Sequence, residues 1–452
     1  MVRPQVSDNI CVRCKGARLL CGKAKCPILV KYSILKSTLS VDPGKFKGKQ
    51  DIFGASPPAV FVGHVGYPYV NIGPLIPIGN FSAQKDTRYL DSPESWFGKD
   101  INEIIAFRSG LVRSNFKMNI KYNLPLMELE KELPRTNLKL LKATQELTLA
   151  SNSVDTEAKL NRIRVGMLYG THSPPQGPSG RAEKIEIVDN VKVLKPVDKA
   201  VSDTDLKAAD AIEEYLYRAE DLSITSIQRI FSAGLLGVKQ NRRLVPTRWS
   251  ITAVDDIIGK YLKTKLQHFP SIDKYYSFFG EYLDNKFVII FMPGPWAYEM
   301  NECWNQSSIW NQKVEGILPP VQTTKPVIVT DYEFEKGRTK YAGNVTGAYY
   351  AARKEIEEFL YDSRKQARVI VFREVSGGYI VPLGVWVIRE TVKQALAQGW
   401  KGPNVKIHET LDSALSRVAS KLSIPLEYWT HSSQLLPYIK KQRRLDFWLR
   451  RL

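Results

Sequence analysis

Four of the five cysteines of this chain lie within residues 11–26, in the sequence CVRCKGARLLCGKAKC. Thiolates at the spacing of Cys11, Cys14, Cys21 and Cys26 can hold one metal ion in tetrahedral geometry. Two disulfide bonds are the alternative, but disulfides are uncommon in intracellular chains, and the rest of the sequence holds only Cys303. We therefore expect one structural Zn²⁺. An iron–sulfur cluster is less favoured because a compact knuckle needs no redox chemistry.

Acidic side chains offer a second possible chemistry. Carboxylates that converge can hold Mg²⁺, as they do in nucleases, but adjacent carboxylates on one helix usually point apart. We expect most of them to lie on solvated faces, and a metal-dependent nuclease stays as the alternative function. No phosphate-binding glycine loop, nucleophile elbow or zinc-protease motif occurs, and Cys303 is expected to be a buried thiol without a catalytic role. The candidate carboxylates are Asp255, Asp256, Glu299, Glu302, Asp331 and Glu333.

The elements that would position these residues alternate between strand and helix patterns. Apolar runs broken by Gly and Pro predict strands in 57–80, and two alternating runs about Asp189-Asn190 predict a hairpin over 183–196. Helical periodicity dominates 201–265. Beyond it we expect a strand over 286–294, a helix over 346–360 and strands over 367–390. This pattern predicts a mixed α/β (α+β) body.

Four regions follow from these signals. They are a basic zinc-knuckle region (1–50), a β-rich part of the body (51–180), an α/β part of the body (181–439) and a terminal tail (440–452). No run of about twenty apolar residues occurs, and the N-terminus lacks the apolar core of a secretory signal. We expect an intracellular, cytoplasmic protein associated with the nucleoid.

Aromatic and histidine side chains in the body have both structural and binding interpretations. The indole-rich stretch 295–310 could stack nucleobases if exposed, but large aromatic residues more often anchor a core, so we expect burial. His64 is expected to be structural. The sparse side chains of VGHVGYP around it would nevertheless let a ligand approach the backbone closely.

The positive charge of the chain is concentrated at its two ends. Of a net charge of +19, residues 1–50 supply 11 Lys or Arg against two Asp, and residues 440–452 supply six against one Asp. Such ends are expected to face a polyanion, most simply nucleic acid, although solvated basic tails without a partner show the same charge. The cations between the cysteines, which a folded knuckle would present to phosphates, are Lys15, Arg18, Lys23 and Lys25.

The tail ends in KKQRRLDFWLRRL, which places large apolar side chains at a terminus. One helical turn would bring Leu445, Trp448 and Leu449 into a single plug, with Gln442 beside it and Phe447 one place early. This arrangement resembles the motif that inserts into the PCNA sliding clamp. Docking of the tail on its own domain, or on a membrane surface, is the alternative.

The chain as a whole resembles the archaeal Nre family of DNA repair proteins. The resemblance rests on the four-cysteine knuckle, VGHVGYPYVNIGP, RSGLVR, VPTRWSITAVDD, PGPWAYEMNECW, TGAYYAARKEIEEFL, PLGVWVIRE and the terminal motif. It implies a DNA-damage-response protein that binds DNA and works with PCNA, and it supplies no catalytic residue. A nuclease and an RNA-processing factor are the competing classes.

Overall fold

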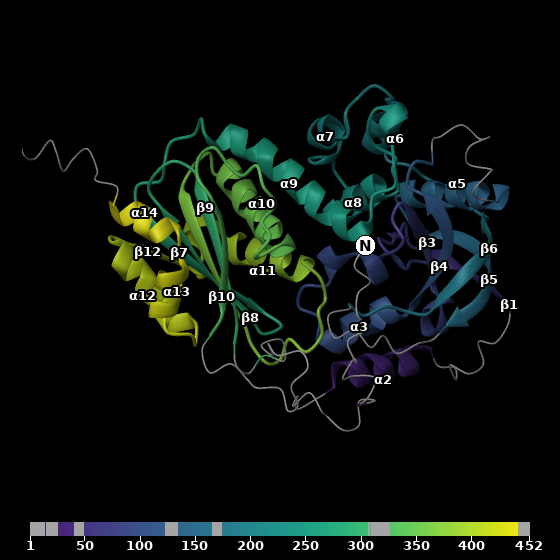
Figure 1. The fold of residues 1–452 in the computed structure, drawn as a ribbon, viewed down its shortest axis with the longest axis horizontal. Coiled ribbons are helices and arrows are strands. Elements are labelled where there is room, and N and C mark those ends of the chain that lie inside the picture. Colours follow the sequence, from purple (N-terminus) through teal and green to yellow (C-terminus); the bar gives the residue numbers. More distant parts are fainter. Residues whose placement is uncertain are drawn as a thin grey trace, which may run out of the picture.

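The computed structural model describes residues 14, 26–39, 49–122, 134–164, 174–305, 308 and 326–441. Its strands form two mixed sheets of six strands each, with helices packed on both (Figure 1). The expected mixed α/β class is therefore confirmed. Most of the expected zinc knuckle and the whole tail from Gln442 onward lie outside the described residues.

The first sheet has the strand order β1-β5-β6-β4-β3-β2. β4 and β6 run parallel, and the other neighbouring pairs are antiparallel. The strands expected in 57–80 are confirmed as β2 and β3, and the sheet continues past residue 180, where the sequence-based boundary was placed. Its strands are β1 (Lys49–Ser56), β2 (Val60–Val62), β3 (Tyr69–Pro77), β4 (Leu111–Asn119), β5 (Val154–Arg164) and β6 (Ser179–Ile187).

Helices from the middle of the chain complete the hydrophobic core of this sheet. Buried side chains of α5 (Arg135–Leu149), α8 (Ile224–Ser232) and most of α9 (Thr247–Leu266) pack against buried strand residues such as Ile72 and Leu160. The helical character expected over 201–265 is confirmed. The remaining elements of this region are α6 (Lys195–Ser202), α7 (Ala208–Ala211) and a π-helical turn (Ile212–Leu216).

The second sheet has the order β10-β9-β11-β8-β7-β12 and is a central layer between helices. β9 and β11 run parallel, and the other pairs are antiparallel. β8 and β11 are buried along nearly their whole length on both faces, as expected for central strands covered by helices on either side. The strands are β7 (Tyr275–Tyr282), β8 (Asn285–Met292), β9 (Ala297–Trp304), β10 (Ile328–Glu333), β11 (Arg368–Val375) and β12 (Val405–His408).

Different helices cover the two faces of the second sheet (Figure 1). α10 (Gly347–Asp362) and α11 (Trp386–Leu396) pack on one face, together with the last turn of α9. The other face is covered by α12 (Leu411–Lys421), α13 (Leu426–Ser432) and α14 (Leu435–Lys441).

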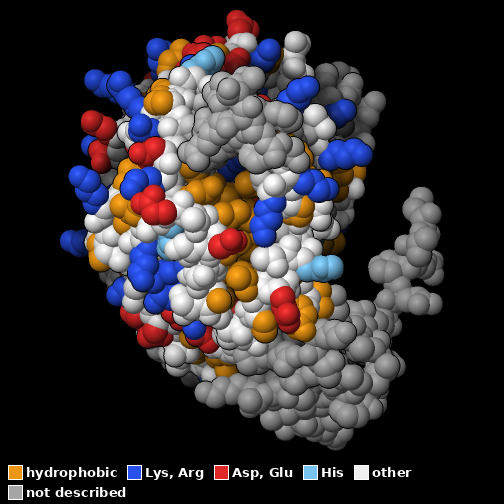
Figure 2. Space-filling view, turned by 90° about the vertical axis from the view of Figure 1, so that its left-hand side faces the viewer, with side chains coloured by type: hydrophobic (Ala, Val, Ile, Leu, Met, Phe, Trp, Pro, Cys, Tyr) orange, Lys and Arg blue, Asp and Glu red, His pale blue; other side chains and the backbone are white. Residues whose placement is uncertain are grey.

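The side of the molecule that carries α12–α14 is chemically mixed (Figure 2). Hydrophobic side chains gather in a hollow there, and Lys, Arg, Asp and Glu side chains are interspersed around it. A surface that faces a polyanion is expected to carry one sign of charge. The side chains that can be seen on this face carry both signs of charge.

The two halves of the body meet at a third apolar cluster. Trp96 packs edge-on against Trp386 with ring centroids 5.3 Å apart, and the Tyr282 hydroxyl donates to the Trp96 carbonyl oxygen at 2.8 Å. α3 (Ile101–Ser109) lies in this cluster, and α2 (Pro27–Leu39) packs on α3. Among the described helices, none combines the length and the apolar character needed to cross a membrane.

Two local predictions are wrong. The hairpin about Asp189-Asn190 does not form, because β6 pairs with β5 and β4 and only an isolated bridge joins Val193 to Ala150. In the region 376–390, where strands were expected after β11, the chain turns and begins α11 at Trp386. The β-branched residues of that stretch favour strand locally, but Trp386, Val387 and Val392 pack into the core as a helix face.

Candidate functional site

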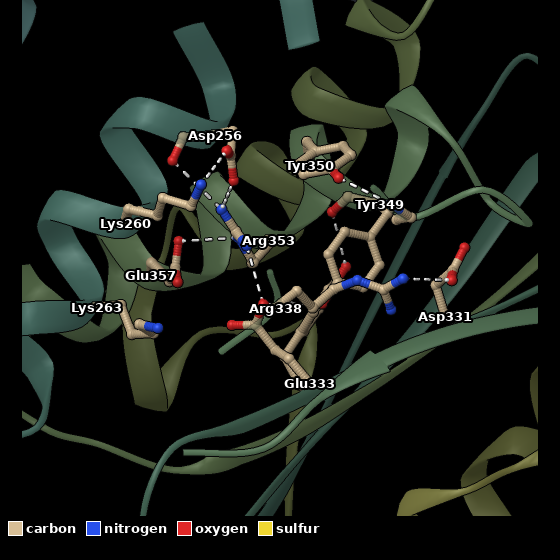
Figure 3. A network of polar contacts seen from close by, with 12 residues as sticks. Asp256, Lys260, Lys263, Asp331, Glu333, Arg338, Tyr349, Tyr350, Arg353 and Glu357 are labelled. Carbon is tan, nitrogen blue, oxygen red and sulfur yellow. Dashed lines mark hydrogen bonds and ion pairs between the residues drawn. The ribbon is translucent and has the colours of Figure 1, made fainter. Parts of the chain in front are cut away.

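Charged side chains from α9, α10 and β10 meet around Arg353 in the interior (Figure 3). Arg353 is only 2% exposed. Its Nη1 donates to Glu333 Oε2 at 3.0 Å and its Nη2 donates to Asp256 Oδ1 at 2.8 Å. Glu357, one helical turn further along α10, lies with Oε2 3.6 Å from Arg353 Nε. One guanidinium thus faces three carboxylates.

A second buried ion pair lies next to this network. Arg389 of α11 donates through Nη2 to both oxygens of Asp255, at 2.8 and 2.6 Å. Asp255 and Asp256 point to different partners, as expected for neighbours on a helix. The expectation that such carboxylates are solvated is wrong for Asp255, which is fully buried because Arg389 neutralises it.

The two carboxylates of β10 complete the arrangement. Glu333 also accepts from the Trp296 indole at 2.9 Å and from the Tyr349 hydroxyl at 3.1 Å. Asp331 forms an ion pair with Arg338 at 3.0 Å, and its Oδ2 accepts from two backbone amides of the segment before α10. Both side chains are therefore bound by groups of this chain and are buried instead of solvated.

Gly259 lets α9 approach α10 at the network. A Cβ atom at this position would lie 2.5 Å from Glu357 Oε2 and 2.8 Å from Arg353 Nη2, so any side chain would displace the charged groups. Within the described part of the chain, neither oxygen of Glu357 has a hydrogen-bond partner. Burial raises the pKa of Glu357 well above its usual value, although Arg353 opposes the rise. Burial therefore disfavours the ionised form of Glu357, and the nearby guanidinium of Arg353 favours it.

The acidic residues of β9 serve separate purposes. Glu299 is buried, and its Oε2 accepts from the backbone amides of Gln434 and Leu435, at 2.7 and 2.6 Å, where α14 begins. Burial raises the pKa of Glu299, and these hydrogen bonds oppose the rise. Glu302 is buried and pairs with Arg373. Neither residue is solvated, and neither joins the Arg353 network.

The described carboxylates therefore do not converge on one metal position. In the described part of the chain, no group of three or more His, Cys, Asp or Glu side chains is placed to hold a metal ion. Cys303 is a buried thiol, as expected, and burial raises its pKa to about 12, which disfavours the nucleophilic thiolate. The arrangement locks helices and strands together and presents no free carboxylate cluster.

Motifs singled out from the sequence meet in this network. VPTRWSITAVDD supplies Asp255 and Asp256, PGPWAYEMNECW supplies Trp296, and TGAYYAARKEIEEFL and PLGVWVIRE supply the arginines. The burial expected for the indoles is confirmed for Trp296, whereas Trp310 lies outside the described residues. Sequence reasoning missed Arg353, Glu357, Arg338 and Arg389. Only the four-residue spacing of Arg353 and Glu357 on one helix could have indicated a pair.

The other predicted sites lie largely outside the described residues. Of the four proposed zinc ligands, Cys14 is buried and Cys26 is partly buried, whereas Cys11 and Cys21 are not described. The cations between these cysteines and the predicted binding residues of the tail are not described either. These undescribed site residues are Lys15, Arg18, Lys23, Lys25, Gln442, Leu445, Phe447, Trp448 and Leu449.

A cavity of about 380 Å³ opens in the first half of the body, beside the start of α8. Its lining mixes apolar side chains, serine hydroxyls and charged groups, and both lining arginines are paired with aspartates. Arg88 pairs with Asp86 at 2.7 Å, and Arg229 pairs with Asp91 at 2.8 Å. The paired charges leave this cavity without a clear preference for a cation or an anion.

Comparison with known proteins identifies the family. Residues 20–311 match the family described as "Archaeal Nre, N-terminal", and residues 333–448 match "Archaeal Nre, C-terminal". No solved structure matches the chain with significant similarity.

Three curated relatives carry the name of DNA repair proteins. The chain is 36% identical to "DNA repair protein NreA" of Archaeoglobus fulgidus over 412 residues, which cover 91% of this chain and 93% of the relative. It is 34% identical to "DNA repair protein NreB" of the same organism over 439 residues, covering 97% and 99%. Identity to "DNA repair protein NreA" of Haloferax volcanii is 32% over 354 residues, covering 76% and 78%. With both halves of its sequence matched in this way, the chain belongs to the archaeal Nre family.

Proposed function

We propose that this protein acts in DNA repair, that it binds DNA, and that its C-terminal tail recruits it to the PCNA sliding clamp. The observation that carries the proposal is the family relationship, because the curated relatives are named DNA repair proteins and match most of the chain. The charge of the two ends supports a polyanionic partner. The site of action would be the cytoplasm, at the nucleoid.

The buried network favours a binding protein over a metal-dependent nuclease. A nuclease of that class needs carboxylates that converge on a metal ion. Here Asp255 is bound by Arg389, Asp256 and Glu333 by Arg353, and the β9 carboxylates by other groups of the chain. The network serves to hold the body rigid, and the basic ends and the tail carry the proposed interactions.

DNA affinity is expected to depend strongly on the basic N-terminal region. Replacing Lys15, Arg18, Lys23 and Lys25 together by Ala should weaken binding to a labelled duplex and flatten its salt dependence, because each phosphate contact adds about 0.9 to the slope of log K against log salt. Fluorescence anisotropy between 50 and 300 mM salt measures both quantities.

The matched control removes the same charge elsewhere, from the exposed residues Lys192, Lys207, Lys401 and Lys406. If both quadruple variants lose affinity equally, the N-terminal region has no special role. If the wild-type protein binds no DNA at all, the proposed function itself is wrong.

One Zn²⁺ per chain is expected, held by Cys11, Cys14, Cys21 and Cys26. Four thiolates fit the tetrahedral coordination that Zn²⁺ prefers in structural sites. Elemental analysis of the purified protein should find one zinc, and the double variant Cys14→Ser, Cys21→Ser should lose it. Cys303→Ser should keep full occupancy because Cys303 is buried in β9. A metal-free wild type, or a double variant that retains zinc, would refute the assignment.

A further inference from the structure

Two large aromatic rings pack against each other on the surface of the described body. Tyr67 lies in the loop between β2 and β3, and Trp249 lies in the first turn of α9. Their ring centroids are 5.5 Å apart at an interplanar angle of 52°. Tyr67 is 49% exposed and Trp249 is 47% exposed. Rings of this size normally contribute to a core, so an exposed pair from two distant motifs indicates an interaction surface.

The backbone around the two rings is well fixed. The Val62 amide donates to Thr247 Oγ1 at 2.9 Å, which joins the end of β2 to the start of α9. The Tyr69 amide donates to the Gly66 carbonyl oxygen at 2.9 Å. Gly66 has a φ of +86°, and a Cβ there would lie 2.8 Å from Tyr69 O, so the loop requires glycine. A preorganised pair loses little entropy when it binds a ligand.

Three sequence segments near the ring pair contain only positive charge, although Asp255 and Asp256 of α9 directly follow the last of them. The segments 60–81, 111–122 and 239–254 contain seven Lys or Arg and no Asp or Glu, although the whole chain has 46 acidic residues among 452. Lys117 and Arg248 are exposed cations of these segments. The seven residues are Arg113, Lys117, Lys121, Lys239, Arg242, Arg243 and Arg248.

These three segments are neighbours in space. The Gly63 amide donates to Asn71 O at 2.8 Å, and Asn71 lies opposite Lys117 in the pairing of β3 with β4. The Leu244 amide donates to Ile120 O at 2.9 Å, which joins the segment before α9 to the end of β4. The three segments that carry the aromatic pair and these cations therefore lie side by side in the fold.

We propose that Tyr67 and Trp249 form a stacking site for unpaired nucleobases of DNA, with Arg248 and Lys117 contacting the adjacent phosphates. This inference rests on the proposed DNA-binding function and deepens it. Single-stranded nucleic acid is bound by surfaces that combine exposed aromatic rings with cations along the backbone path. A duplex hides its base faces within the stack, so the ring pair selects single strands and unpaired positions.

Binding of full-length protein to a fluorescein-labelled 20-nucleotide oligo-dT and to a 20-base-pair duplex tests the site by anisotropy. Tyr67→Ala and Trp249→Ala should each weaken oligo-dT binding about tenfold, the loss typical of one stacked base. Duplex binding should change less than about twofold. Arg248→Ala should lower the salt slope by about one, whereas the ring variants should leave that slope unchanged.

Phe53→Ala is the matched control, because Phe53 is 56% exposed on β1 and lies opposite Glu157 in the sheet. It should not change binding, and thermal melting should confirm that all variants are folded. If the wild type binds oligo-dT and Trp249→Ala binds it as tightly as Phe53→Ala does, the stacking site is wrong and DNA binding stands. If the wild type binds neither DNA, the proposed function fails and this inference fails with it.

Discussion

Replacing Arg353 by Met is expected to lower the free energy of unfolding by about 3–5 kcal/mol, the cost typical of breaking a buried ion pair from one side. The variant would leave Glu333, Asp256 and Glu357 facing one another without their shared cation. Burial alone would lower the pKa of Arg353, but the neighbouring carboxylates raise it well above its usual value. Urea unfolding at pH 7 measures the loss.

An exposed ion pair of the same kind provides the control. Arg218 and Asp362 are joined at 3.0 Å, but their side chains are 48% and 57% exposed. Exposed pairs contribute about 0–1 kcal/mol, so Arg218→Met should change stability little. Equal losses of stability for the two variants would contradict this prediction. They would show that burial does not set the energetic cost of breaking an ion pair, and that the Arg353 network contributes no more to stability than an exposed pair does.

Replacing Trp448 by Ala is expected to weaken PCNA binding by about 2 kcal/mol or more, the loss typical of a central aromatic anchor. In the proposed complex Leu445, Trp448 and Leu449 fill an apolar pocket of the clamp, and Gln442 hydrogen-bonds beside it. Deleting 442–452 should abolish binding. The flanking cations would mainly speed association, so Arg451→Ala should matter chiefly at low salt. Calorimetry at two salt concentrations measures these effects.

The structure of α14, which precedes the tail, allows a test of the alternative that the tail docks on its own domain. α14 is anchored by buried Leu435 and Leu436 and by the carboxylate of Glu299, and it ends at Lys441. Deletion of 442–452 should therefore leave the melting temperature unchanged. A drop of several degrees together with surviving clamp binding would mean that the tail stabilises its own domain and does not bind PCNA.

Continuous apolar runs and long helical periodicity predicted β8, β11 and α10 of the second half, but not β7, β9 or β12. β8 and the helix α10 lie where the pattern places them, because burial on both faces and a strong helix signal leave little choice. The prediction of strands in the segment that forms α11 was wrong because valine and isoleucine favour strands locally. Its neighbours in the folded chain, such as Trp96 beside Trp386, decided the outcome, and they come from almost 300 residues away.

The site was less predictable than the fold. The six carboxylates were recognised, but whether they are solvated depends on partners distant in sequence. Asp256 meets Arg353 across 97 residues, and Asp255 meets Arg389 across 134. A single sequence contains no signal for such pairs. Motif membership was the better guide, since four of the recognised motifs converge on the network.

The position of α9 has a consequence for chimeras with relatives. Val254, Ile258 and Leu262 belong to the core of the first sheet, whereas Leu266 and the contact with α10 belong to the second. A crossover point on either side of α9 would join it to a foreign surface on one of its two faces. Recombination within the family should therefore yield folded hybrids only when α9 is inherited together with the first sheet and with α10, or when the foreign surface matches the helix by chance.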